Sequence, residues 1–185
     1  MTITIKQTPS SLKLALLAAM AVVSAGVATS SQAASATATA NGTVVTPITI
    51  AAAGNLAFGS FARGAGGSVT VSTSGVRATT GPILMGTATS SAARFNINGT
   101  AAATYSITHS GSTVLTNTTG TGGETMALAK FSDLTAGNAT SGNATSGTLD
   151  AAGAQSLYVG GALTVAATQA SGLYVGTVIA TVEYN

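Results

Sequence analysis

The sequence contains no cysteine, no tryptophan and a single histidine. Without cysteine there is no disulfide framework, thiolate metal site or thiol nucleophile. One histidine excludes any metal site built on several imidazoles. A Ser-His-Asp arrangement would have to combine His109 with Asp133 or Asp150, and no serine lies in a Gly-x-Ser-x-Gly elbow. We therefore expect a protein that is not an enzyme and holds no metal or cofactor, with His109 in a solvated turn.

Charge is also scarce, at 5% of residues against about 25% in an average protein. The formal net charge is +2. Lys6 and Lys13 lie in the N-terminal leader, and the remaining basic and acidic residues balance. A neutral chain lacks the electrostatic surface that nucleic acid requires, and it has little repulsion to oppose self-association.

Residues 1–33 have the pattern of a cleavable helical secretory signal peptide: Lys6 and Lys13, an apolar run over residues 14–28, and then small residues. The run is shorter than the ~20 residues of a membrane-spanning helix, which favours cleavage over a membrane anchor. The cleavage site stays open among Ala33, Ala34 and Ala36. We expect export to the periplasm and then to the cell surface or a fimbrium.

After the leader, apolar residues recur with a period of two in short segments separated by turn residues. No segment keeps a period of 3.6, so the sequence predicts an all-β domain of sandwich or barrel type over residues 44–185. The predicted strands cover residues 44–50, 55–61, 68–72, 83–85, 94–98, 103–108, 126–131, 157–165 and 172–185.

Residues 138–142 and 143–147 repeat the sequence Asn-Ala-Thr-Ser-Gly. The repeat is polar and rich in turn residues, so it predicts a mobile surface loop over residues 135–150 that contributes nothing to the core.

The last fourteen residues predict a strand that ends the chain without a following element. One side of this strand carries Gly176, Val178, Ala180, Val182 and Tyr184. A final strand with an apolar side and no later partner indicates an edge that another chain covers.

At the other end, residues 34–43 form a candidate arm in which Ala36, Ala38 and Ala40 alternate with hydroxyl residues. Methyl groups bury little surface, so this segment does not hold itself against a core. Asn41-Gly42 predicts a turn or break before Val44.

The C-terminal stretch resembles the pilin signature of chaperone-usher fimbrial subunits, with a penultimate tyrosine, alternating apolar residues and a glycine at the fourteenth position from the end. The resemblance implies an immunoglobulin-like, pilin-like sandwich that lacks its last strand. A periplasmic chaperone would cover the groove, and at the outer-membrane usher the arm of the next subunit would replace it. The implied groove edge is Gly172, Gly176, Val178, Ala180, Val182 and Tyr184, and the implied donor strand is Ala36, Ala38, Ala40 and Val44.

The mature chain also resembles a secreted bacterial family described as domain of unknown function 4402. The matching features are the Ala-Thr alternating start, residues 44–48, 56–59, 93–99 and 159–163, and the closing Gly-x-Tyr-x-Gly with its alternating strand.

We therefore expect a structural subunit that polymerises head to tail with like subunits. The alternative is a monomeric surface adhesion or carbohydrate-binding sandwich, in which Tyr105 or Tyr158 would contact the ligand. A self-associating matrix of amyloid type is a further alternative, favoured by low charge and opposed by the many glycines.

Overall fold

The computed structural model describes residues 32–86, 88–119 and 122–185. The chain divides into two units, Met1–Thr43 and Val44–Asn185. In the first unit, residues 32–43 are exposed and have no regular secondary structure, so Ala36, Ala38 and Ala40 are not in a strand. The predicted signal peptide lies outside the described residues, apart from its last two.

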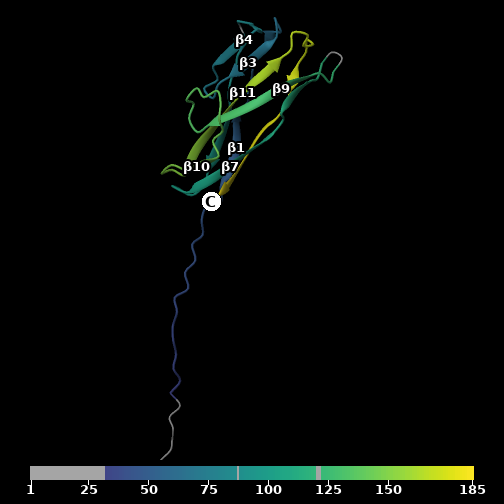
Figure 1. The fold of residues 1–185 in the computed structure, drawn as a ribbon. Helices are drawn as coiled ribbons and strands as arrows, with labels where there is room; N and C mark the ends of the chain where they lie inside the picture. The colour runs from purple at the N-terminus through teal and green to yellow at the C-terminus, as the bar shows by residue number, and fades with distance from the viewer. Residues whose placement is uncertain (1–31, 87, 120–121) are drawn as a thin grey trace, which may run out of the picture. The chain divides into compact units, whose positions relative to one another are not determined.

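In the second unit, every regular element of the described residues is a β-strand, and every pairing is antiparallel (Figure 1). This confirms the predicted all-β class. The strands are β1 Thr49–Gly54, β2 Phe61–Ala62, β3 Gly67–Val71, β4 Arg77–Thr80, β5 Ile83–Leu84, β6 Ala93–Asn98, β7 Thr104–Gly111, β8 Val114–Asn117, β9 Thr125–Asp133, β10 Ser146–Thr148, β11 Ala154–Val165, β12 Tyr174–Val175 and β13 Val178–Tyr184.

The larger sheet is built around the long strand β11, and its main order is β1-β6-β11-β9-β8-β12. β11 pairs with β6 through residues 154–159, with β3 through residues 161–165 and with β9 through residues 158–163. A smaller sheet has the order β10-β7-β13, and β2 pairs with β5 in a two-stranded ribbon.

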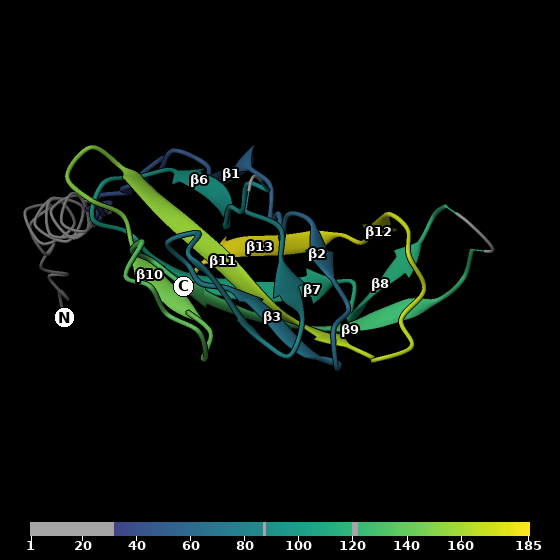
Figure 2. The ribbon, with the colours of Figure 1, turned by 90° about the horizontal axis from the view of Figure 1, so that it is seen from above.

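The two main sheets share a core. Phe95, Ile97 and Leu157 of the larger sheet pack in one cluster with Tyr105 and Val182 of the smaller sheet. A second cluster lies under the far end of β11 and includes Val69, Met126, Leu128 and Leu163. Two antiparallel sheets with apolar inner faces form a sandwich. Figure 2 shows β11 crossing β13 and β7 in this arrangement.

The C-terminal segment shows where the predicted period of two holds and where it fails. In β13, Ala180 and Val182 are buried while Ile179, Thr181 and Glu183 are exposed. The predicted strand is not continuous, however: it breaks at Gly176 and Thr177, and β12 pairs with β8 while β13 pairs with β7. An added Cβ at Gly176 would meet the side chain of Leu115, so glycine permits the close approach at the break.

Further expectations need correction. The strand predicted over residues 44–50 begins only at Thr49 and continues to Gly54 as β1, and the strand predicted over residues 55–61 is irregular up to Phe61 apart from a bridge at Ala57. The strand predicted to end at Thr108 continues to Gly111, so His109 lies within β7 and not in a turn. Part of the predicted loop 135–150 is the strand β10, and it does contribute to the core, because Leu149 is 2% exposed and Ala144 packs against the first cluster. Hydrogen bonds also anchor the loop at Ala139, whose N–H donates to Thr73 Oγ1 over 2.9 Å.

Candidate functional site

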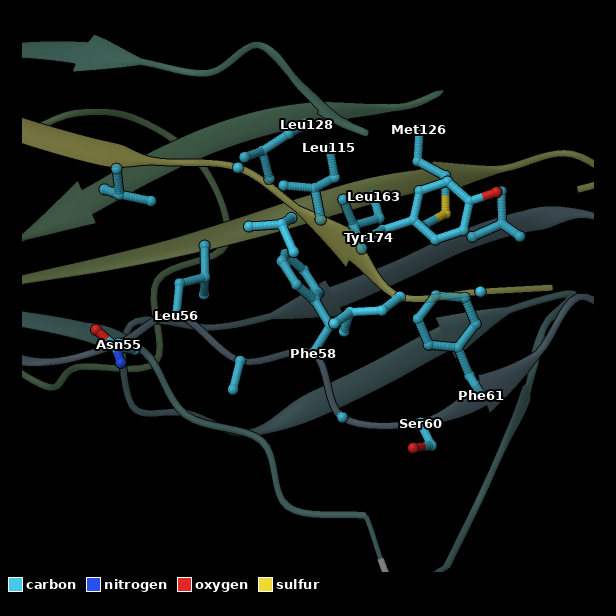
Figure 3. Close-up of a pocket in the computed structure, with 18 of the residues that line it drawn as sticks. Asn55, Leu56, Phe58, Ser60, Phe61, Leu115, Met126, Leu128, Leu163 and Tyr174 are labelled. Atoms are coloured by element: carbon cyan, nitrogen blue, oxygen red, sulfur yellow. The ribbon is translucent and has the colours of Figure 1, made fainter. Parts of the chain in front are cut away.

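A groove of about 960 Å³ with an apolar floor lies between the segments 54–63 and 169–178 (Figure 3). β1 pairs only with β6, and β13 pairs only with β7 among the described strands. β1 lies next to β13 without pairing with it. Ala52 and Gly54 of β1 and Val178 of β13 line the groove, so it lies at one end of a seam where two strand edges have no partner.

The floor of the groove is formed by Leu115, Met126, Leu128 and Leu163, which come from β8, β9 and β11. One wall is the segment 54–63, and the other is the segment 169–178. Figure 3 shows Leu56 and Phe58 pointing from their wall toward the floor residues. The second core cluster thus lies at the base of an open groove.

The free edge of β13 follows from its register with β7. The Ser112 N–H donates to the Thr177 carbonyl over 2.9 Å, and the Asn185 N–H donates to the Thr104 carbonyl over 3.3 Å. Hydrogen-bonded pairs alternate in an antiparallel ladder, so residues 179, 181 and 183 also bond to β7. The N–H and C=O groups of Val178, Ala180 and Val182 point the other way, toward the seam. No other described strand pairs with that side.

The groove wall that carries Phe58 is held by hydrogen bonds from the Arg77 side chain and not by a long series of backbone hydrogen bonds. Arg77 Nη1 donates to the carbonyls of Phe58 over 2.9 Å and Ser60 over 3.2 Å. Its Nη2 donates to the carbonyl of Met85 over 3.1 Å. Other contacts of this wall are a bridge between Ala57 and Ser91, a bond from Ser91 Oγ to the Asn55 carbonyl, a bond from the Met85 N–H to the Ser60 carbonyl, and the two-residue pairing of β2 with β5.

The end of β13 away from the groove is closed by Tyr184. Its hydroxyl donates to the Thr46 carbonyl over 2.8 Å and accepts from the Thr100 N–H over 2.6 Å. Thr46 N–H also donates to Thr100 Oγ1 over 3.0 Å. The start of the second unit is thereby tied to the end of the chain.

The six predicted edge residues divide into two groups. Gly172, Gly176 and Val178 line the groove, whereas Ala180 and Val182 are buried in the first core cluster and Tyr184 lies at the closed end. Of the predicted donor strand, Ala36, Ala38 and Ala40 are exposed coil, and Val44 is 98% exposed. Our sequence reasoning did not assign the floor residues Leu115 and Met126 to a site. Leu115 lay in no predicted strand, and Met126 was placed only by sharing a strand face with Leu128.

Tyr105, considered as a ligand contact, and His109, considered as a catalytic residue, both make contacts that support the fold. Tyr105 is 0% exposed, so the prediction that it contacts a ligand is wrong. His109 Nε2 lies 2.9 Å from the Ala144 carbonyl oxygen and 3.0 Å from Ser132 Oγ, and so connects β7 to β9 and the 135–145 loop. Among the described residues no three His, Asp or Glu side chains cluster as a metal site.

The fold and groove define a class of protein: an antiparallel two-sheet domain with an open apolar seam between strand edges. The chain belongs to the family described as Domain of unknown function (DUF4402), whose model matches residues 48–184. The match begins after the arm and extends through β13. No curated protein matches the chain. Within the described residues, no helix has the length and apolar character needed to cross a membrane.

Proposed function

We propose that this protein is an exported structural subunit of a bacterial surface fibre, assembled by donor-strand exchange. The observation that carries the proposal is the groove with an apolar floor at the end of the unpaired edges of β1 and β13. In this assembly, residues 34–43 of one copy enter the groove of the next.

An inserted strand would pair with the open backbone groups of β13 and cover the apolar side chains at the floor of the groove. Its backbone would bond to the outward N–H and C=O groups of Val178, Ala180 and Val182, and alternate side chains would point to the floor at Leu128 and Leu163. Main-chain bonds supply affinity in this mode of recognition, and the side-chain pockets supply specificity. The exposed coil of residues 34–43 has the period of two that such an insertion needs.

The geometry of the second unit also supports head-to-tail growth. The chain enters this unit at Val44 and Thr46, next to Tyr184. The groove is lined by Gly176 and Val178, at the opposite end of β13. A donor attached at one end and a groove at the other form a heterologous contact that builds a filament.

The open groove also motivates the proposed partners. An exposed apolar surface in a secreted subunit promotes aggregation before assembly. We propose that a periplasmic chaperone covers the groove until exchange occurs at an outer-membrane usher, after the signal peptide has directed the chain through the secretory pathway.

Deletion of residues 34–43 tests the proposal. The truncated subunit should keep the thermal unfolding transition of the full chain, because these residues are exposed coil, and it should form no fibres. A Gly-Ser segment of equal length in place of residues 34–43 is the matched control, and it should also fail to assemble. Electron microscopy and size-exclusion chromatography give the readout. Normal fibres from the truncated subunit would refute the donor role of the arm.

A further inference from the structure

A second, polar trough of about 510 Å³ lies on the larger sheet, away from the groove. Its lining includes Arg94, Asn96 and Asn98 of β6, Ser156 and Tyr158 of β11, and the segment 134–136. We infer that this trough binds an acidic saccharide, with Arg94 holding its carboxylate. The inference concerns a single subunit and does not depend on assembly into fibres.

The trough residues face outward from the sandwich. Arg94 is opposite Tyr158, and Asn96 is opposite Ser156, in the β6–β11 register. Their neighbours in sequence, Phe95 and Leu157, are buried in the core. Side chains alternate across a strand, so the polar residues form a row on the outer face.

Arg94 is the cation in the described residues whose donors are unused. The arginine is exposed, and its guanidinium carbon lies 5.9 Å from the centre of the Tyr158 ring. It makes no hydrogen bond or ion pair in the described part of the chain. Arg77, by contrast, donates to three carbonyls, and Arg63 and Lys130 each donate to one. The Tyr158 ring holds the Arg94 guanidinium, and the planar set of N–H donors of the guanidinium stays free. Arg94 is therefore suited to bind a carboxylate.

The rest of the trough offers groups that bind hydroxyls. Ser156 Oγ donates to Asn96 Oδ1 over 3.4 Å, which leaves the two amide N–H groups of Asn96 available. Asn98 is exposed at the end of the same row. From Arg94 to Asn98 the strand covers about 14 Å, at ~3.4 Å per residue. This length suits a short oligosaccharide better than a single ion.

Two carboxylates lie in or near the trough and keep their negative charge, and each accepts hydrogen bonds within the chain. Asp150 Oδ1 accepts from the N–H groups of Ala152 and Ala154 over 2.8 and 2.9 Å. Asp133 Oδ2 accepts from Thr135 Oγ1 over 3.0 Å. Asp150 is hydrogen-bonded to Ala154, which lies opposite Asn98, so its charge is at the other end of the row from Arg94 and directs the ligand's carboxylate to the Arg94 end. The remaining lone pairs of both carboxylates are acceptors for sugar hydroxyls.

The test uses the full secreted chain as a monomer, titrated by calorimetry with oligogalacturonate and with a neutral malto-oligosaccharide. We expect oligogalacturonate to bind and the neutral sugar to bind at least tenfold more weakly. Arg94→Gln should weaken oligogalacturonate binding at least tenfold without shifting the unfolding temperature. Arg63→Gln, the matched control, should leave binding unchanged.

Three outcomes overturn the inference. Absence of oligogalacturonate binding at millimolar concentration removes the site. Equal binding of both sugars removes the carboxylate role of Arg94. An equal loss of oligogalacturonate affinity in the Arg94→Gln and Arg63→Gln variants would show that the ligand is attracted to positive charge in general. Because the measurement is made on monomers, its failure leaves the assembly test unaffected, and failure of assembly leaves the binding test unaffected.

Discussion

The hydroxyl of Tyr184 donates a 2.8 Å hydrogen bond to the backbone carbonyl of Thr46 and so joins the last strand to the point where the second unit begins. The same hydroxyl accepts from the backbone N–H of Thr100. One side chain thus closes one end of the sandwich while the seam stays open at the other.

Replacing Tyr184 with phenylalanine should destabilise the fold by about 1–2 kcal/mol, because two hydrogen bonds are lost and the Thr100 N–H loses its partner. Denaturant unfolding measures the change. Tyr158→Phe is the control, since the Tyr158 hydroxyl makes no hydrogen bond in the described part of the chain. Equal stability of the Tyr184→Phe and Tyr158→Phe variants would contradict the closing role of Tyr184.

Arg77→Lys should loosen the groove wall that carries Phe58. Lysine cannot reproduce the planar fork that donates to Phe58, Ser60 and Met85. We expect a loss of about 1–2 kcal/mol and faster proteolysis between residues 57 and 62. Arg63→Lys removes the fork from an arginine with one carbonyl partner and should change neither property. Unaltered cleavage in the Arg77→Lys variant would refute its positioning role.

Tyr105→Phe should stabilise the domain. Tyr105 is fully buried opposite Gly147, and its hydroxyl has no hydrogen-bond partner in the described part of the chain. Removing an unpaired buried hydroxyl should raise the free energy of unfolding by about 1 kcal/mol. A loss of stability would show that the hydroxyl has a partner, such as an ordered water.

Burial of the Tyr105 hydroxyl should also make the free energy of unfolding depend on pH. Burial raises the pKa of Tyr105 above its usual value of about 10. The unfolded chain therefore releases this proton at lower pH than the folded chain, and stability falls as pH rises above about 10. Tyr105→Phe should reduce that fall in unfolding experiments between neutral and alkaline pH. An identical alkaline slope in the two proteins would contradict the assignment to Tyr105.

Bulkier arm residues should strengthen the junction between subunits. Ala38 and Ala40 bury little apolar surface, at ~0.8 kcal/mol per buried CH₂, so Ala38→Val and Ala40→Val should raise fibre stability by about 1–2 kcal/mol each. Thr37→Val and Thr39→Val, on the other side of the arm, are the controls and should have less effect. Fibre dissociation in guanidinium chloride measures the difference, and equal effects on both sides would contradict an inserted strand.

Sequence reasoning predicted the elements whose side chains alternate clearly. Phe95 and Ile97 placed β6, and Val178 to Tyr184 placed β13, because one buried face imposes a period of two. It missed β4 and β10, since short strands of Thr, Ala, Ser and Gly have no apolar face to reveal them. It also missed β8, whose four residues are too few to show a period of two.

The groove was predicted only in part, because it depends on pairing between distant segments. The apolar alternation of Leu56 and Phe58 was visible, but it predicted a strand, whereas the segment is mostly irregular and held by Arg77. The position of His109 was missed for a similar reason: its partners Ser132 and Ala144 lie in other elements. Contacts over such separations are set by register and not by local pattern.

Hydrogen exchange at single amides of β13 tests the central claim most directly. Ile179 and Thr181 bond to β7, whereas the N–H groups of Ala180 and Val182 face the seam. In the monomer we expect slow exchange at Ile179 and Thr181 and faster exchange at Ala180 and Val182. On assembly, Ala180 and Val182 should become protected while Ile179 and Thr181 stay as they were. Fibres in which Ala180 and Val182 still exchange as in the monomer would contradict donor-strand insertion at this edge.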